Sequence, residues 1–309
     1  MSKSLKIFAP ATVANLSCGF DVLGCCLDTV GDEMVISLSS TPGVKITKIV
    51  GATLPFETHK NVAGVATEAL LKEYGKNIGI EIEIYKKIKA GSGIGSSAAS
   101  SAGAVWAVNH LLDSPFTPNQ LIPFAMEGEK LASGNAHADN VAPALLGGFT
   151  LVRSYSPLDV IKLHTPKDLF MTVIHPQIEV KTSDSRSVIK NKVSLQKAIH
   201  QWGNVGGLVA GLYTEDYQLI GRSLEDVIIE PLRSILIPEF DTVKTTALKN
   251  GALGCGISGS GPSIFALSRG NQNAIVIAEH IKKIYDTTGI DFDIHVSKIN
   301  NNGVKILNN

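Results

Sequence analysis

Residues 89–102 read Lys89-Ala90-Gly91-Ser92-Gly93-Ile94-Gly95-Ser96-Ser97-Ala98-Ala99-Ser100-Ser101-Ala102, a run of glycines and small hydroxyl residues. Isoleucine and glutamate alternate over residues 80–84, which predicts a half-buried strand before this run. Residues 97–112 lack proline and carry apolar side chains at helical spacing, which predicts a helix after it. Glycines let backbone N–H groups crowd around an anion, and a helix start favours negative charge. The pattern therefore predicts a phosphate site.

Two familiar phosphate loops do not fit this run. The P-loop requires a lysine directly after its last glycine, but Gly95 is followed by a serine. The dinucleotide fingerprint, started at Gly91, meets a serine in place of its third glycine. Started at Gly93 it ends on Ala98, but Asp113, where an acidic residue is expected, ends a helix rather than a second strand. An ordinary loop remains the alternative, and the flanking strand and helix favour phosphate.

The composition limits the class of protein and its partners. The chain has 309 residues, with Lys plus Arg and Asp plus Glu both at 28, so two domains and no net charge are expected. Without a basic excess, nucleic acid and anionic membranes are poor candidate partners. No apolar run reaches the ~18 residues of a membrane span, which predicts a soluble protein. The four cysteines lack Cys-x-x-Cys spacing, which indicates a reducing cytoplasm and no zinc site.

Strand and helix patterns alternate without repeats, which predicts an α+β protein with mixed strand order. The expected strands are residues 5–9, 34–40, 44–50, 80–88, 148–153, 169–174 and 263–267. The expected helices are residues 62–74, 97–112, 118–133, 195–213, 216–226 and 272–285.

Two further expectations concern the organisation of the chain. Residues 292–299 and 304–307 are expected to form a hairpin around Asn302-Gly303. Proline-containing interruptions between residues 153 and 168 place a domain boundary there, with domains 1–160 and 161–309.

The helix over residues 118–133 carries two candidate metal ligands. Mg²⁺ prefers one or two carboxylates plus substrate phosphates, so Glu129 with the Ser97 hydroxyl can hold such an ion. Glu127 is the rival, because both glutamates lie equally far from the centre of the apolar stripe of this helix. For either one, a solvated helix face is the plain alternative.

Two other segments combine glycine with polar residues. In residues 9–24, Asn15 and Asp21 stand in apolar company, where they either tie a loop together or bind a ligand. Residues 254–263 hold four glycines, which fits a second anion nest and equally a tight crossing between two strands.

Taken together, the motifs resemble those of the GHMP kinase superfamily. The segments 10–24, 91–101 and 254–263 match its three characteristic motifs in the expected order. Segments 14–21, 137–143 and 230–238 are similar to the homoserine kinase branch. The departures are small, with Lys89 in place of a common proline and Ile94 in place of a common leucine.

The resemblance implies a fold and an activity. The fold is the two-domain GHMP kinase fold, with a ribosomal protein S5 domain 2-like N-terminal domain and a ferredoxin-like C-terminal domain. The activity is ATP-dependent phosphorylation of the L-homoserine side-chain hydroxyl, on the route to threonine. ATP and Mg²⁺ are the implied cofactors, and a cytoplasmic homodimer is the implied form.

The resemblance also assigns roles to residues. Arg186 and Arg233 are the implied forks for the substrate carboxylate. The implied partners of the amine and polar end are Asn15, Asp21 and His137. Thr182 and Asn140 are placed near the reacting hydroxyl, and Ser97 and Glu129 on Mg²⁺. The implied nucleotide contacts are Asn61, Ala90, Gly91, Ser92, Gly93, Ile94, Gly95, Ser96, Ser97, Ala98, Ala99 and Ser100.

The base that takes the hydroxyl proton is left open. Some members of the superfamily use an aspartate where this chain places Asn140, and an amide cannot accept the proton. Catalysis by orientation alone is one hypothesis, and the neighbouring Asp139 as base is the other. Two alternatives to the activity also remain: a kinase for another small alcohol such as mevalonate or shikimate, and a catalytically silent relative that senses a ligand.

Overall fold

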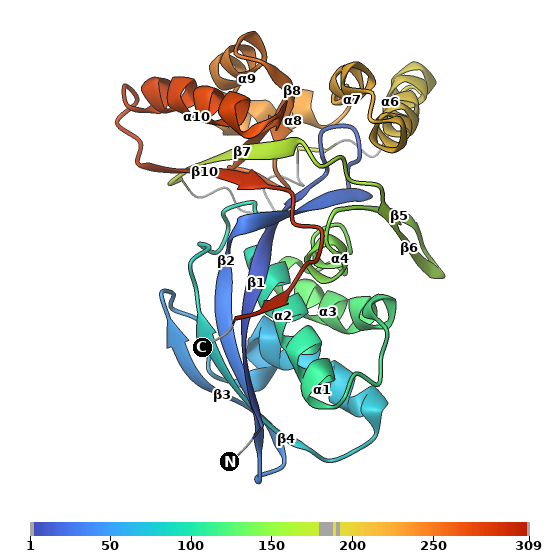
Figure 1. Cartoon of the computed structure of the whole chain (residues 1–309), viewed down its shortest axis with the longest axis vertical. Coiled ribbons are helices and arrows are strands. Elements are labelled where there is room, and N and C mark those ends of the chain that lie inside the picture. The colour runs from blue at the N-terminus through green and yellow to red at the C-terminus, as the bar shows by residue number, and fades with distance from the viewer. Residues whose placement is uncertain (1–2, 179–187, 190–191, 308–309) are drawn as a thin grey trace.

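The computed structural model describes residues 3–178, 188–189 and 192–307. It has two lobes, each built on one β-sheet with helices packed against it (Figure 1). The N-terminal lobe contains the glycine run, and the C-terminal lobe lies over one end of its sheet. The α+β class and the mixed strand order predicted from the sequence are both confirmed.

The N-terminal sheet has strand order β11-β1-β2-β4-β3, with β5 and β6 added beside β2. Only β3 and β4 run parallel among its described pairs, and the other pairs are antiparallel. Its strands are β1 (Ser4–Ala14), β2 (Leu23–Ser39), β3 (Gly43–Val50), β4 (Gly79–Tyr85), β5 (Phe149–Tyr155), β6 (Leu158–Leu163) and β11 (Lys305–Ile306).

Four α-helices lie on one side of this sheet; α1, α2 and α4 pack against its strands, and α3 packs on these helices (Figure 1). They are α1 (Val62–Tyr74), α2 (Ser96–Leu111), α3 (Pro118–Ser133) and α4 (Val141–Leu146), and a short 3₁₀ turn, η1 (Thr58–Lys60), precedes α1. Their ends follow the sequence signals: α1 stops at Gly75 and α3 at Gly134, both in the left-handed conformation. The side chain of Gln120 accepts a hydrogen bond from the backbone of Thr117, which caps α3.

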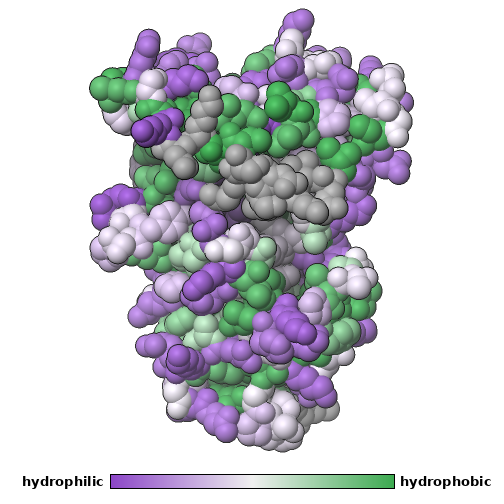
Figure 2. Space-filling view, turned by 180° about the vertical axis from the view of Figure 1, so that it is seen from behind, coloured by the Kyte–Doolittle hydropathy of each residue, from purple (hydrophilic) through white to green (hydrophobic). Residues whose placement is uncertain are grey.

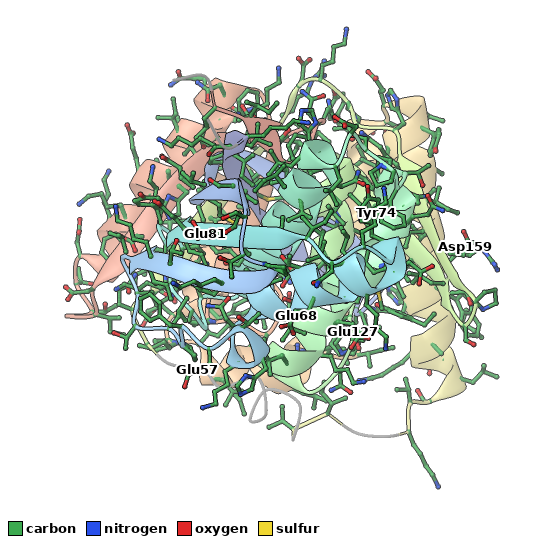
Figure 3. All side chains as sticks on the ribbon, turned by 90° about the horizontal axis from the view of Figure 1, so that it is seen from below. Glu57, Glu68, Tyr74, Glu81, Glu127 and Asp159 are labelled. Atoms are coloured by element: carbon green, nitrogen blue, oxygen red, sulfur yellow. The ribbon has the colours of Figure 1, made fainter. Side chains whose placement is uncertain are left out.

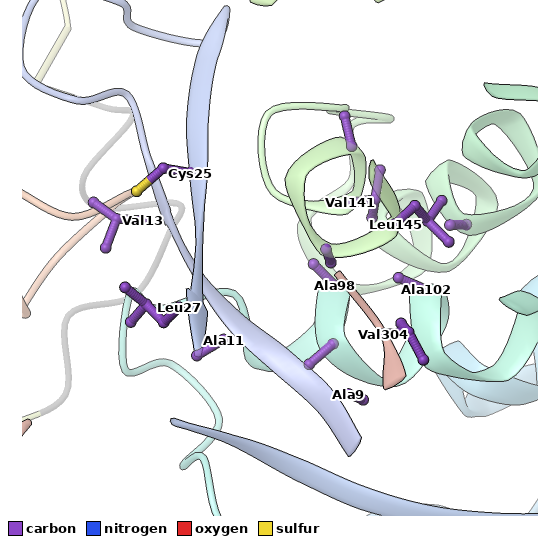
Figure 4. Packing of buried hydrophobic residues seen from close by; sticks show 14 of the residues in the cluster. Ala9, Ala11, Val13, Cys25, Leu27, Ala98, Ala102, Val141, Leu145 and Val304 are labelled. Atoms are coloured by element: carbon purple, nitrogen blue, oxygen red, sulfur yellow. The ribbon is translucent and has the colours of Figure 1, made fainter. Parts of the chain in front are cut away.

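Helix α2 lies between β1 and the other helices, which explains its small residues. A Cβ added at Gly103 would lie 2.9 Å from both Ala9 and Met34, so α2 sits directly against the sheet. Figure 4 shows Ala98 and Ala102 of α2 facing Val141 and Leu145 of α4, with Val304 from the end of the chain close by. The run of Ala, Ser and Gly after the glycine loop is therefore a packing requirement as well as a helix start.

The C-terminal lobe has an antiparallel sheet of order β10-β7-β9-β8. In chain order this is 4-1-3-2, the order of a ferredoxin-like sheet, as the resemblance implied. The strands are β7 (Leu169–Pro176), β8 (Ala252–Ile257), β9 (Ile264–Arg269) and β10 (Phe292–Lys298). The helices are α6 (Leu195–Thr214), α7 (Tyr217–Ser223), α8 (Glu230–Arg233), α9 (Phe240–Lys249) and α10 (Asn271–Tyr285), with the 3₁₀ turn η2 (Ser234–Leu236) between α8 and α9.

The terminal hairpin expected from the sequence is wrong. β10 pairs with β7 in the C-terminal sheet, whereas β11 pairs with β1 in the N-terminal sheet. The turn at 300–303 exists, but it is closed by the Asn300 side chain, whose Nδ2 donates to Gly303 O at 2.9 Å. The two flanking strands separate into different lobes after this turn, so the end of the chain returns to the first lobe. The boundary near residue 160 stays a prediction.

Two observations bear on the setting of the protein. None of the described helices is both long and apolar enough to cross a bilayer. The four cysteines are buried free thiols, and burial raises the pKa of each.

The turn at Asn300 gives a stability prediction. Its Oδ1 accepts from the backbone N of Asn302 at 2.8 Å and of Gly303 at 3.2 Å. Asn300→Ala leaves the buried N–H and C=O of Gly303 without these partners and is expected to lower the free energy of unfolding by about 1–3 kcal/mol. Urea denaturation checks this, with Asn302→Ala, at an exposed position in the same turn, as the control. Equal stability of the two variants would contradict a closing role for Asn300.

Candidate active site

A cavity of about 370 Å³ lies between the two lobes. Its wall is formed by the 15–21 loop, the glycine loop, the end of α3, residues 137–140, and Arg233 with Gly259 and Ser260 from the C-terminal lobe. Segments more than 200 residues apart in the sequence thus meet around one space, which is large enough for a small-molecule site.

The glycine loop has the backbone conformation that an anion-binding loop requires. Gly91, Gly93 and Gly95 have φ of 74°, 82° and 69°, a backbone region that other residues rarely adopt. Gly95 directly precedes α2, so the loop and the start of the helix form one wall of the cavity. The buried hydroxyl of Ser92 has no hydrogen-bond partner among the described residues. These features fit a phosphate ligand.

The segment 254–263 supports this loop rather than forming a second nest. It is the tight crossing between β8 and β9. Ser258 Oγ donates to Gly93 O at 2.8 Å, and Ser263 Oγ donates to Ser92 O at 2.6 Å. A Cβ at Gly93 would lie 2.7 Å from two backbone oxygens of this crossing, so the two glycine segments are in direct contact.

Glu129 is the buried carboxylate of the site, which resolves the choice between the two glutamates. Glu127 is exposed on α3 (Figure 3), whereas Glu129 is 7% exposed and lines the cavity. Its Oε1 has no hydrogen-bond partner among the described groups. Burial raises the pKa of Glu129 to about 7, against a smaller lowering by a hydrogen bond with Ser97. A buried, unpaired carboxylate oxygen beside a hydroxyl fits a divalent cation that also binds phosphate.

The structure adds a cation that the sequence reasoning missed. Lys86 follows β4, lines the cavity and forms a buried salt bridge with Asp32 of β2. Its Nζ also donates to Ser96 O at 2.9 Å and to Ser100 Oγ at 3.2 Å. Asp32 in turn accepts from the backbone N atoms of residues 87 and 88 at 2.7 and 3.0 Å. The ion pair therefore fixes the entry to the glycine loop and holds the Lys86 ammonium against the start of α2.

A sequence signal for this pair was present. Ile80, Ile82 and Ile84 are buried in β4, and the same alternation makes residue 86 the next inward position. In β2, Asp32 precedes the buried Met34 by two residues, so both charges continue an inward-facing series. A charged residue at a position that the alternation places inside the protein predicts a buried partner of opposite charge.

The other end of the cavity carries polar and charged groups. Asn15 Nδ2 donates to Gly259 O at 2.8 Å, and Asn15 Oδ1 accepts from Asp21 N at 3.0 Å. His137 Nδ1 lies 3.8 Å from Asp21 Oδ1. Arg233 is 3% exposed; its Nη1 donates to Gly259 O at 3.2 Å. Asn15 thus ties its loop together and also lines the cavity. Its structural role is confirmed, and its position allows the predicted contact with a ligand as well.

Tyr155 is a second residue that the sequence did not single out. Its hydroxyl donates to Asp21 O at 2.7 Å and accepts from Ala138 N at 3.2 Å. Its ring meets that of His137 edge-on, with centroids 6.3 Å apart. Tyr155 therefore holds the two loops that carry Asp21 and His137. Its place at the end of β5 gives no signal in the sequence, because the partners are distant in the chain.

Asp139 and Asn140 both line the cavity, with different surroundings. Asp139 is 5% exposed. The Thr12 hydroxyl donates to Asn140 Oδ1 at 2.7 Å, which leaves the amide NH₂ of Asn140 as its donor toward a ligand. A Cβ at Gly95 would lie 2.9 Å from Asn140 Oδ1, so this amide lies against the glycine loop.

Some predicted contacts do not reach the cavity wall. Asn61 caps α1, with its Oδ1 accepting from Ala63 N and its Nδ2 donating to Pro55 O, so both ends of the amide are used. Ile94, Ala98 and Ala99 belong to the buried core and do not line the cavity. Thr182 and Arg186 lie outside the described residues. The remaining predicted residues are all part of the cavity wall.

Comparison with known proteins identifies the family. The GHMP kinase N-terminal domain model matches residues 61–148, and the GHMP kinase C-terminal model matches residues 208–287. A curated homoserine kinase of Chloroherpeton thalassium is 47% identical over 99% of this chain and 100% of its own length. The chain belongs to the homoserine kinase family of GHMP kinases.

Further relatives agree with this membership. The homoserine kinase of Chlorobaculum tepidum is 46% identical over 99% of this chain and 98% of its own. A crystal structure of homoserine kinase from Cytophaga hutchinsonii superimposes with a TM-score of 0.96 at 54% identity, covering 99% of this chain and 98% of that one. The L. major mevalonate kinase, at 16% identity and a TM-score of 0.72, shares the fold alone. The predicted family and two-domain fold are confirmed.

The raised pKa of Glu129 gives a pH prediction. The carboxyl is protonated below about pH 7, and a metal ligand must be ionised. Raising the pH from 6 to 8 is therefore expected to strengthen the Mg²⁺-dependent part of ADP binding about tenfold. Calorimetric titration of ADP with and without Mg²⁺ measures this Mg²⁺-dependent part. Its increase between pH 6 and pH 8 should be absent in Glu129→Gln and should remain in Glu127→Gln. The same pH dependence in both variants would exclude Glu129 as its source.

Proposed function

We propose that this chain transfers the γ-phosphoryl group of ATP to the side-chain hydroxyl of L-homoserine. The observation that carries the proposal is that a phosphate cradle and a cluster of amino-acid-binding groups line the same cavity. The family membership and its kinase chemistry support the reaction type.

The polar end of the cavity suits a zwitterionic amino alcohol. Arg233 offers a planar cationic fork for the carboxylate. Asp21 and Asn15 offer oxygen acceptors for the ammonium, with His137 beside them. Hydrogen bonds to Tyr155 and Gly259 hold the loop that carries Asn15 and Asp21. Little conformational entropy of this loop is therefore lost when the substrate binds. Arg186 and Thr182 remain proposed contacts on the basis of the family motif.

The nucleotide end suits a di- or triphosphate with a divalent cation. The loop N–H groups and the start of α2 would hold the β- and γ-phosphates, and the Lys86–Asp32 pair would keep the entry to this loop in place. Ser97 and Glu129 would hold Mg²⁺, which when bound offsets the charge that develops on the transferred group. Because the transition state of phosphoryl transfer is loose, these positioning groups carry most of the catalysis. The nucleotide contact of Asn61 stays a proposal; its side chain caps α1, whose first residue, Val62, lines the cavity.

The proton of the attacking hydroxyl can leave in two ways. Asn140 is an amide held by Thr12, so it orients the hydroxyl and cannot accept its proton. Asp139 is the adjacent carboxylate on the cavity wall. We propose catalysis by orientation through Asn140, with Asp139 as the competing base.

Two substitutions separate these roles. Asp139→Asn is expected to lower turnover less than about tenfold, because no proton transfer to it is required, whereas Asn140→Ala should lower it more strongly. Thr12→Val is the control, since it removes the bond to the amide but keeps the amide itself. Steady-state kinetics with a binding assay measure both effects. A loss of more than ~10³ for Asp139→Asn with binding intact would identify Asp139 as the base.

Substrate analogues test the amino-acid assignment. 4-Hydroxybutanoate lacks the ammonium and 3-amino-1-propanol lacks the carboxylate, and each should lose about 10- to 100-fold in kcat/KM relative to homoserine. Coupled ADP-release assays compare them, with mevalonate, shikimate and galactose included. Higher activity on mevalonate or shikimate would point to another kinase of the superfamily. ATP binding without turnover on any alcohol would point to a silent relative.

The compartment and the oligomeric state are also proposals. We place the enzyme in the cytoplasm as a homodimer. Its four buried free thiols fit a reducing compartment, and the homodimer is proposed from the family resemblance.

A further inference from the structure

The 15–21 loop lies between β1 and β2 and has an unusual backbone. Asn15, Leu16, Ser17 and Asp21 have φ of 72°, 44°, 57° and 59°, in the left-handed region. Residues other than glycine rarely adopt this region; they persist there where the surrounding structure holds them, which is common at functional sites. Leu16 is bulky and fully buried. The contacts of this loop therefore maintain its shape, and they indicate which side chains the shape positions.

One of these contacts joins the loop to Arg233 of the other lobe. The Arg233 Cζ lies over the ring of Phe20, 5.1 Å from its centroid, and both side chains line the cavity. Hydrophilic residues are spread over the outside of both lobes (Figure 2), whereas Arg233 is 3% exposed. A cation over an aromatic face is attracted by the ring, and more strongly where water is excluded. The stack therefore orients a buried guanidinium.

An aromatic ring orients a guanidinium in a different way from a carboxylate. The N–H donors of an arginine lie in the plane of the guanidinium, and a ring below this plane uses none of them. A bidentate carboxylate partner would take two donors, which the carboxylate of a substrate also needs. The Arg233 Nη1 donates to Gly259 O at 3.2 Å, which sets the rotation of the group within its plane. Phe20 and Gly259 thus define the orientation of the fork together.

A second connection keeps the loop and the arginine at a fixed spacing. Gln201 Nε2 of α6 donates to Cys18 O at 2.9 Å, within the 15–21 loop, and to Asp226 Oδ1 at 3.0 Å. The other oxygen of Asp226 accepts from Glu230 N at 2.9 Å, at the start of α8. Helix α8 ends at Arg233. The loop and α8 are therefore joined at two places, by the stack and through Gln201.

We propose that Phe20 is a positioning residue that makes the cavity selective for an α-amino acid. Its ring sets the plane of the Arg233 fork, and the next residue in the chain is Asp21, the proposed acceptor for the ammonium. An α-amino acid carries its carboxylate and its ammonium on the same carbon, so the two binding groups must keep a fixed spacing. Adjacent residues of one constrained loop meet that condition. The inference rests on the proposed function, because it assigns the substrate carboxylate to Arg233.

Replacing the ring tests this role. Phe20→Leu keeps an apolar side chain but removes the aromatic face. It should lower kcat/KM for homoserine about tenfold, mainly through KM; this corresponds to ~1.4 kcal/mol, between the values of exposed and buried cation–π contacts. Coupled ADP release measures the change, and the KM for ATP should stay within about twofold. Phe20→Tyr keeps the ring and should retain kcat/KM within about threefold.

Substrate analogues separate this role from a general loosening of the loop, which would affect every substrate. 4-Hydroxybutanoate keeps the carboxylate, so Phe20→Leu should lower its kcat/KM by the same factor as for homoserine. 3-Amino-1-propanol lacks the carboxylate, so its kcat/KM should change less than about twofold. In an Arg233→Ala background, adding Phe20→Leu should also change kcat/KM for homoserine less than about twofold, because the ring then has no guanidinium to orient.

Phe8→Leu is the matched control. The Phe8 ring also lies below a cation, with Lys305 Nζ 4.9 Å from its centroid, and Phe8 is not among the described residues that line the cavity. This variant should leave kcat/KM for all three compounds unchanged. Thermal unfolding and calorimetric titration of ADP check that each variant is folded and binds nucleotide. Phe20→Met, which fills more of the volume of the ring, gives the same test if Phe20→Leu does not fold.

Two results would overturn the proposal. One is an equal loss of kcat/KM for homoserine and 3-amino-1-propanol on replacing Phe20 with leucine. The other is a loss for homoserine that is as large in the Arg233→Ala background as in the unmodified protein. Failure of the proposed function gives a different result: the unmodified protein would then not phosphorylate homoserine, and this inference would fail with it.

Discussion

The hydrogen bonds between the β8–β9 crossing and the glycine loop are the constraint on which the rest of the site depends. A loop that offers N–H groups to an anion must turn its carbonyl groups away from it, and those carbonyls then need partners behind the loop. Ser258 and Ser263 supply them, to Gly93 O and Ser92 O. The phosphate cradle of the first lobe is therefore completed by the second lobe, which explains why the site lies between them.

The same crossing also sets the other end of the cavity. Gly259 O accepts from both Asn15 and Arg233, which belong to different lobes. One short segment thus fixes the distance between the groups that face phosphate and those that face an amino acid. For a transfer reaction this matters more than any single contact, because the reacting atoms must be held in line.

Buried charge is concentrated where the reaction is proposed to occur. Lys86 and Asp32 are paired and hydrogen-bonded to the entry of the glycine loop. Glu129, by contrast, is buried, its Oε1 has no hydrogen-bond partner among the residues that the structure describes, and burial raises its pKa. Structural ion pairs are normally satisfied, whereas a carboxylate left unsatisfied marks the position at which a ligand completes the structure.

The sequence by itself determined the elements whose signals are local. The glycine loop, the caps and stops of α1 and α3, and the α+β class follow from residues close together in the chain, because turns, caps and side-chain alternation are short-range effects. Only the tertiary structure decided the matters that join distant residues. It chose Glu129 over Glu127, since burial depends on the neighbouring helix α2 and helical spacing could not separate them. The segment 254–263 supports the glycine loop through hydrogen bonds. The two strands of the expected terminal hairpin belong to two different sheets. In each case the local sequence was compatible with more than one structure, and contacts with a distant part of the chain determined which one forms.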